Sequence, residues 1–170
     1  MPYEPPFEIT PDISTVALEF AEMVGSLPPA SDLAASPTLH RRLRIQTIHS
    51  SLAIEQNTLT EEQVTAVLEG KRVLGPPDDI REVENAKRAY DLMNELNPFS
   101  LDDLLRAHGT MMEGLAKDAG RFRSKNAGVY AERGVLVHAG TPATYVPGVM
   151  SDVFAWLKGT EVPPLIASCV

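Results

Sequence analysis

Apolar residues recur at helical spacing along most of this chain, and the runs begin with helix-capping signals. The first three runs follow Thr10-Pro11, Ser36-Pro37 and Thr60. A hydroxyl at the start of a helix accepts a hydrogen bond from a free backbone N–H, and proline is tolerated at the next position because no donor is needed there. Gln63, three residues after Thr60, completes a capping box. These signals predict a mainly helical fold.

Glycine, proline and, after the second helix, the segment Gln56-Asn57-Thr58 mark where the predicted helices end. The first ends at Gly25, the second directly after Glu55, and the third at Gly70. With the segments that follow, the predicted helices cover residues 11–25, 37–55, 61–70, 77–97, 100–115, 149–159 and 164–170. Their apolar stripes, such as Ile13 to Val24 and Leu39 to Leu52, are expected to face a shared core.

The pattern changes between Gly134 and Val146. Residues typical of strands lie on both sides of Gly140-Thr141-Pro142, which predicts a small hairpin or an extended segment there. Two short strands are not stable alone, so the hairpin is expected to lie against the helices. The predicted fold class is therefore mainly α, with one small β-hairpin.

The composition disfavours several classes of protein. The chain has 170 residues, 44% of them hydrophobic, enough for one domain with a core. No apolar run reaches the roughly 18 residues of a membrane span, and the net charge of −8 disfavours general binding to nucleic acid. One cysteine and no secretory signal suggest a cytoplasmic location. Segment 117–133 is basic; a solvated loop is favoured over a phosphate contact.

Few residues combine into a recognisable chemical motif. No metal-ligand, phosphate-binding or nucleophile motif occurs within any one segment. His108 lies on an apolar stripe and is interpreted as a hydrogen-bonded core histidine rather than a catalytic one. Ser51 and Glu55 share one helix face at positions i and i+4, close to a helix end that disfavours a carboxylate. Glu55 therefore points to water or pairs with a cation elsewhere, and the residues alone favour water.

Several stretches resemble one family of proteins. The sequence from Arg44 to Thr60, RIQTIHSSLAIEQNTLT, is similar to the inhibitory helix of Fic-domain proteins. Further similar stretches follow in order: Gln63-Val64, Gly70 to Pro77, Glu82 to Ala86, Leu105 to His108 with Met112, Gly120 to Arg123, Val137-His138, Val146-Pro147 and Ala155 to Leu157. The opening Pro5 to Pro11 also resembles the start of such chains. The resemblance implies a Fic-like helical bundle.

Fic proteins mostly transfer AMP from ATP to a hydroxyl of a target protein, and the resemblance implies roles for two parts of this chain. In the subclass that it resembles, a helix with Ser/Thr-x-x-x-Glu-Gly/Asn is inhibitory, because its glutamate pairs with a catalytic-loop arginine and obstructs the ATP γ-phosphate. Ser51 and Glu55 take these positions, while Gln56 stands where glycine or asparagine is expected. The resemblance also implies a flap that binds the target by strand-like pairing, formed by Val135, Leu136, Val137 and His138.

The catalytic signature of that family, His-x-Phe-x-Asp/Glu-Gly-Asn-Gly-Arg-x-x-Arg, is not found in these 170 residues. The resemblance places it shortly after the apolar stretch Leu165 to Val170, which is interpreted as an interrupted core helix. We expect residues 1–97 to form an N-terminal helical region and 98–170 the first, truncated part of a Fic core, without catalytic or metal-binding residues. The complete enzyme would use ATP and Mg²⁺; this chain is expected to bind neither tightly and to be inactive.

Three hypotheses remain open. The chain is the front part of a self-inhibited protein AMP-transferase, or a regulatory module that donates Glu55 to a partner enzyme, or an all-α scaffold with a purely structural resemblance. The first is favoured. Its partner would be a protein with a hydroxyl side chain, and neither nucleic acid nor a membrane is expected to bind. Uncovered apolar faces predict lower stability or self-association into a homo-oligomer.

Overall fold

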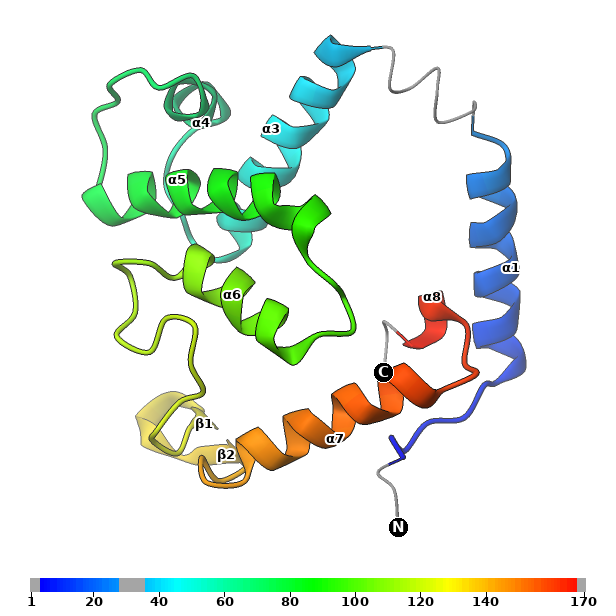
Figure 1. The fold of residues 1–170 in the computed structure, drawn as a ribbon. Coiled ribbons are helices and arrows are strands. Elements are labelled where there is room, and N and C mark those ends of the chain that lie inside the picture. Colours follow the sequence, from blue (N-terminus) through cyan, green and yellow to red (C-terminus); the bar gives the residue numbers. More distant parts are fainter. Residues whose placement is uncertain (1–3, 28–35, 168–170) are drawn as a thin grey trace.

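The computed structural model describes residues 4–27 and 36–167. Its helices are α1 (Pro11–Gly25), α3 (Pro37–Ile54), α4 (Glu61–Leu68), α5 (Pro77–Leu92), α6 (Leu101–Met111), α7 (Val146–Gly159) and α8 (Pro164–Ala167), with short 3₁₀ helices η1 (Met93–Glu95) and η2 (Glu132–Gly134). Strands β1 (Gly128–Tyr130) and β2 (Leu136–Ala139) form an antiparallel pair. Figure 1 shows α3 to α6 on one side of the molecule and α1 on the other. The predicted fold class is confirmed.

The capping residues read from the sequence begin the helices as predicted. The hydroxyl of Thr10 accepts from the backbone N–H of Ile13 at 3.3 Å. At α4 the capping box is complete: Gln63 N–H donates to the Thr60 hydroxyl at 3.2 Å, and Thr60 N–H donates to Gln63 Oε1 at 2.9 Å. Each such cap satisfies a backbone donor that the helix itself leaves free.

The main hydrophobic core lies between α3, α4 and α5. Ile48 of α3, Val64 of α4 and Val83 of α5 are at most 1% exposed, as expected for the inward face of each helix. The cluster is completed by Leu52, Leu59, Val67 and Ala86. This part of the molecule buries its apolar faces well, so it fixes the position of the end of α3.

One polar side chain is completely buried between α5 and α6. Asn85 is 0% exposed, and its amide donates to the backbone carbonyls of Met111 and Glu113, both at 2.9 Å. Arg88 in turn donates to the Asn85 carbonyl oxygen at 2.5 Å. The last carbonyls of a helix have no hydrogen-bond partner within the helix. Asn85 supplies that partner at the C-terminal end of α6.

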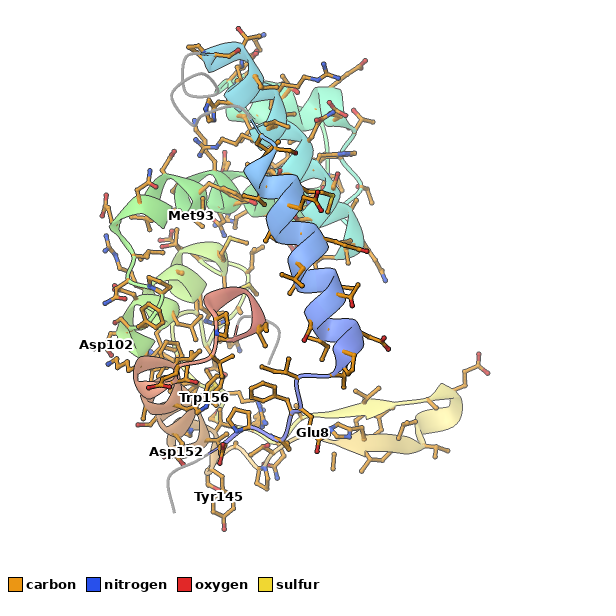
Figure 2. The ribbon with its side chains drawn as sticks, turned by 90° about the vertical axis from the view of Figure 1, so that its right-hand side faces the viewer. Glu8, Met93, Asp102, Tyr145, Asp152 and Trp156 are labelled. Atoms are coloured by element: carbon orange, nitrogen blue, oxygen red, sulfur yellow. The ribbon has the colours of Figure 1, made fainter. Side chains whose placement is uncertain are left out.

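The apolar stripe of α1 does not enter this core, which differs from the expectation. None of the α1 residues is buried, and Ile13, Val16, Phe20 and Val24 are 40–64% exposed. Just before α1, the ring of Phe7 meets Trp156 of α7 edge to face, with centroids 6.1 Å apart. Figure 2 shows Trp156 close to this N-terminal segment. The start of the chain is therefore attached to α7, and α1 extends from that attachment.

The second helix begins at Pro37 as predicted, but the first half of its apolar stripe is not buried as expected. Leu39 and Leu43 of α3 are 37% and 50% exposed, so only the second half of its stripe is buried. Near the other end of the chain, α8 covers Pro164–Ala167, and the rest of the predicted last helix lies outside the described residues. The fifth predicted helix ends earlier than expected, at Met111, and Gly114 adopts a positive φ of 73°.

The hairpin is present, but its two strands are not those predicted. β2 pairs with β1, which precedes it, and the connection between them is η2. The prediction placed the turn at Gly140-Thr141-Pro142, which instead connects β2 to α7. Val137 is the extra residue of a bulge, because Val129 pairs with His138 and Tyr130 with Leu136. Figure 2 shows the hairpin projecting away from the helices, contrary to the expectation that it lies on them.

Candidate functional site

Ser51 and Glu55 lie together on the outer face of the last turn of α3. Both are exposed, whereas Leu52 between them is 8% exposed and belongs to the core. The carboxylate of Glu55 forms no ion pair with another described residue. The structure thus places the carboxylate of Glu55 in solvent, as the residues alone favoured. The inhibitory role that the resemblance implies for the two residues remains a prediction.

The helix ends directly after Glu55, at a residue with left-handed backbone geometry. Gln56 has φ 69°, the one positive φ among the non-glycine residues described. Its N–H donates to the carbonyl of Ala53, and Asn57 N–H donates to that of Leu52, both at 3.1 Å. This pair of bonds is a Schellman motif. Gln56 therefore adopts the geometry that glycine or asparagine usually provides, at a conformational cost of about 1–2 kcal/mol.

The segment after Gln56 is tied to the first turns of α5. The Asn57 amide donates to the Asp79 carbonyl at 3.0 Å and to the Glu82 carboxylate at 2.7 Å. The carboxylate of Asp79 accepts from both the backbone N–H and the hydroxyl of Thr58, at 2.8 and 2.5 Å. We call residues 56–60 with these α5 partners the α3–α4 corner.

The electrostatics of the α3–α4 corner follow from these bonds. The hydroxyl of Thr58, and then its backbone N–H, lower the pKa of Asp79, because both bonds favour the ionised carboxylate. Burial raises this pKa, but by less than the hydrogen bonds lower it. The carboxylate is therefore held in its charged form, which is the form that accepts both hydrogen bonds.

The residues expected to form the target-binding flap lie in or beside the hairpin. Leu136, Val137 and His138 belong to β2, and Val135 precedes that strand in an extended conformation. All four residues are exposed, with exposed fractions of 61% for Val135, 51% for Leu136 and 65% for Val137. A two-stranded sheet has an unpaired edge on each strand, which is the geometry that strand-like pairing requires. Target binding at this edge remains a prediction.

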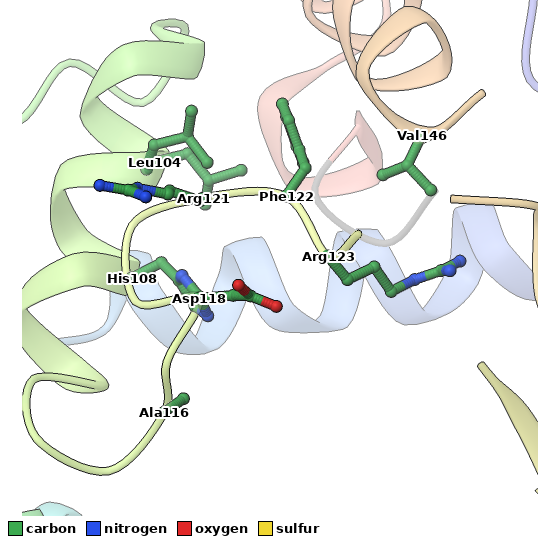
Figure 3. Close-up of a pocket in the computed structure, with 9 residues that line it drawn as sticks. Leu104, His108, Ala116, Asp118, Arg121, Phe122, Arg123 and Val146 are labelled. Atoms are coloured by element: carbon green, nitrogen blue, oxygen red, sulfur yellow. The ribbon is translucent and has the colours of Figure 1, made fainter. Parts of the chain in front are cut away.

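A pocket that the sequence did not predict lies between α6 and the loop that follows it. It has a volume of about 420 Å³, and Figure 3 shows His108 and Asp118 on one side of it and Val146 on the other. The remaining lining residues are Leu104, Leu105, Ala116, Arg121, Phe122 and Arg123. The pocket needs three separate segments to meet, so no single sequence motif could have revealed it.

His108 is hydrogen-bonded as predicted, but it is not a core residue. It is exposed along the wall of this pocket, and its Nδ1 accepts from the backbone N–H of Gly120 at 3.0 Å. The basic segment 117–133 is largely a loop, as favoured. Within it, Arg123 donates to the carbonyl oxygens of Lys125 and Thr141, so this side chain connects the loop to the segment after β2.

The described residues also contain neither a metal-ligand cluster nor a membrane-spanning helix. No group of three or more His, Cys, Asp or Glu side chains that could hold a metal ion occurs in residues 4–27 and 36–167. No helix in the same ranges is long and apolar enough to cross a membrane. The polar residues that sequence reasoning missed are Asn57, Asp79 and Asn85. Each of them forms at least one hydrogen bond with a residue more than 20 positions away in sequence.

Comparison with known proteins gives a match among the solved structures. No protein-family model matches the sequence, and the search of curated proteins gave no match. The structure is similar to the crystal structure of a Fic family protein from Desulfovibrio desulfuricans G20, with a TM-score of 0.88 and 46% sequence identity. The match covers 98% of this chain and 51% of that one, so this chain spans about half the length of the protein it resembles. The fold is a Fic-like helical fold.

Proposed function

We propose that this chain is the N-terminal, self-inhibitory part of a Fic-type protein adenylyltransferase. The observation that supports this most is its likeness to a Fic family protein, at 46% identity over 98% of the chain. Because the likeness covers nearly the whole chain, it includes both α3 and the hairpin. The complete enzyme would transfer AMP from ATP to a hydroxyl of a target protein, and Glu55 would restrain that reaction.

The inhibitory role falls to Glu55 because of where its carboxylate lies. The side chain is exposed at the end of a helix whose opposite face, at Leu52 and Ile48, is buried in the core. A carboxylate on a rigid support, without a cation beside it among the described residues, is available to pair with a cation that comes from another part of the enzyme. We propose a catalytic-loop arginine as that cation, with Ser51 one turn earlier on the same face.

The hairpin would hold the target protein. Its residues from Val135 to His138 are exposed and include an unpaired strand edge. The apolar side chains of Val135, Leu136 and Val137 are 51–65% exposed. An extended segment of a target can pair with such an edge through main-chain hydrogen bonds, which fixes its register. We propose that this pairing brings the target hydroxyl toward the nucleotide.

ATP and Mg²⁺ are assigned to the complete enzyme and not to these residues. The described part of the chain offers no group of three acidic, histidine or cysteine side chains for a metal ion. We therefore assign no metal-dependent step to it and propose that this chain alone does not transfer nucleotide.

The proposal is tested by a substitution in the full-length protein that contains this chain. With radiolabelled ATP, Glu55→Gly should raise the rate of self-modification, because the restraining carboxylate is gone. Glu62→Gly is the matched control, since Glu62 is an exposed glutamate in the first turn of α4. No rise for Glu55→Gly would refute the inhibitory assignment, and no labelled product in any variant would refute the proposed transferase.

A second candidate function rests on the exposure of Glu55. Since this carboxylate is accessible from outside the chain, the chain could instead restrain a separate Fic enzyme. Adding this chain in trans to an active Fic enzyme separates the two. Inhibition that depends on Glu55 supports a regulatory module, whereas no inhibition supports the first function.

A further inference from the structure

Among residues 4–27 and 36–167, nothing packs against the end of α3 on the face that carries Ser51 and Glu55. Both side chains are exposed, and so is Ile54, at 80%. Helix α3 is held on the opposite face, through Leu52, and at its end, through the α3–α4 corner. The direction of the Glu55 carboxylate therefore depends on how firmly the α3–α4 corner is fixed.

The geometry of the α3–α4 corner depends on a contact that bridges 21 residues of sequence. The Asp79 carboxylate, in the first turn of α5, accepts two hydrogen bonds from Thr58, and Thr58 follows Glu55 by three residues. The only other side-chain bonds that tie residues 56–60 to α5 among the described residues come from the Asn57 amide. The Asp79 carboxylate thus accepts two of the four side-chain hydrogen bonds that tie residues 56–60 to α5.

The position of Gln56 makes this support more important. Glutamine in a left-handed conformation is less favourable than glycine, so the helix end has a local tendency to leave this geometry. Hydrogen bonds to Thr58 and Asn57 oppose that tendency, because they are made only when the chain turns as observed. Charged acceptors form stronger hydrogen bonds than neutral ones, and Asp79 is such an acceptor.

We propose that Asp79 is a positioning residue for the inhibitory glutamate: by binding the backbone N–H and hydroxyl of Thr58, it holds the end of α3 so that the Glu55 carboxylate points toward the catalytic loop. This inference rests on the proposed function, since it requires that Glu55 inhibits. It assigns no contact with nucleotide or target to Asp79. Loss of the Asp79 carboxylate weakens the restraint while leaving the glutamate in place.

The test measures self-modification of the full-length protein with radiolabelled ATP in the original protein and three variants: Asp79→Ala, Glu55→Gly and the double variant. Asp79→Ala should raise the rate by about two- to tenfold, the factor expected for losing one or two hydrogen bonds of ordinary strength. In the Glu55→Gly background the same substitution should give no further rise, because there is no carboxylate left to position. A purely structural role of Asp79 would instead lower the rate, or change it equally in both backgrounds.

Two further variants serve as controls. Asp78→Ala removes the neighbouring carboxylate, which is also in the first turn of α5 but makes no bond to Thr58, and should leave the rate unchanged. Thr58→Val removes the hydroxyl bond to Asp79 and keeps the backbone bond. It should therefore raise the rate, but by less than Asp79→Ala does. If Asp79→Ala does not fold, Thr58→Val takes its place in the comparison.

The outcomes distinguish the positioning role of Asp79 from the proposed inhibitory role of Glu55. If Glu55→Gly raises the rate but Asp79→Ala and Thr58→Val do not, the positioning role is wrong and the proposed function stands. If the Asp79 substitution raises the rate equally with and without Glu55, Asp79 acts elsewhere and the inference is again wrong. If Glu55→Gly itself has no effect, both the inhibitory assignment and the positioning role fail.

Discussion

The backbone N–H of Gly120 donates a hydrogen bond to Nδ1 of His108, at 3.0 Å. Because Nδ1 accepts, the ring proton lies on Nε2 in this arrangement. The contact is possible because the chain passes very close to α6: a side chain at Gly120 would meet the Cα of Gly109 and the carbonyl of Leu105, both at 3.2 Å. Gly120 also has φ 71°. The loop beyond α6 is thus attached to that helix through two glycines and one histidine.

This close approach predicts that Gly120→Ala destabilises the protein for two reasons. The left-handed backbone costs about 1–2 kcal/mol with any side chain, and the new methyl group pushes against Gly109. Gly134→Ala is the matched control, since Gly134 has φ 75° with no atom within 4 Å of an added Cβ. Urea unfolding of both variants should show the greater loss at Gly120. Equal losses would show that the contact with Gly109 is unimportant.

A second prediction concerns Asn85. Replacing it with alanine leaves the carbonyls of Met111 and Glu113 without their donor inside the fold. An unsatisfied buried polar group costs about 1–3 kcal/mol, so Asn85→Ala should lower the free energy of unfolding by at least this amount. Asn94→Ala, at an exposed position, should change it by no more than about 0.5 kcal/mol. Similar values for the two variants in urea unfolding would contradict the structural role.

The left-handed conformation of Gln56 leads to a stabilising substitution. Gln56→Gly should raise the free energy of unfolding by about 1 kcal/mol, because glycine adopts φ 69° without a steric penalty. Gln56→Ala keeps the penalty and should give little or no gain. Thermal unfolding of both variants checks this, and a gain for alanine equal to that for glycine would mean that helix-end geometry is not the cause.

The lowered pKa of Asp79 makes part of the stability depend on pH. A carboxylate whose pKa is lower in the folded state stabilises the protein at pH values above its ordinary pKa, which is 3.8 for aspartate. This contribution is lost as the pH falls through the folded-state pKa. The stability difference between the original protein and Asp79→Asn should therefore be largest near neutral pH and shrink below about pH 4. Thermal unfolding at several pH values measures it. In a Thr58→Val background the difference should depend less on pH, and an unchanged dependence would argue against Thr58 as the cause.

The exposed stripe of α1 predicts self-association of this 170-residue chain. Phe20 is 46% exposed and Val16 is 64% exposed, and exposed apolar patches of this kind favour contact with another molecule. Phe20→Asp should shift sedimentation velocity profiles toward monomer, whereas Glu22→Gln, on the same helix, should not. A monomeric original chain at high concentration would contradict the prediction.

Much of the local structure could be predicted from the sequence. The capping box of Thr60 and Gln63, and the buried positions of Ile48 and Val64, follow from hydroxyl spacing and apolar periodicity alone. The end of α3 was predicted to within one residue: the helix was expected to end after Glu55, and it ends at Ile54 with Glu55 as its C-cap. These features depend on interactions within a few residues, so they are visible in a short stretch of sequence.

The hairpin was located only in part, because turn signals do not say which strands they connect. Gly140-Thr141-Pro142 has a typical turn composition, yet it leads from β2 into α7. The partner strand β1 has only three residues, too few to show an alternating pattern. In α1 the stripe was recognised correctly as one face of a helix, but periodicity does not reveal whether anything covers that face.

The sequence by itself determined the helices, their caps and the i, i+4 placement of Ser51 and Glu55 on one face, since hydrogen bonds and side-chain spacing within a helix act over one or two turns. Only the tertiary structure decided that Asp79 binds Thr58 and that Asn85 closes α6. Those contacts join residues more than twenty positions apart. They form because packing of α3, α4, α5 and α6 around Ile48 and Val83 brings their ends together, and no local pattern specifies which polar groups then meet.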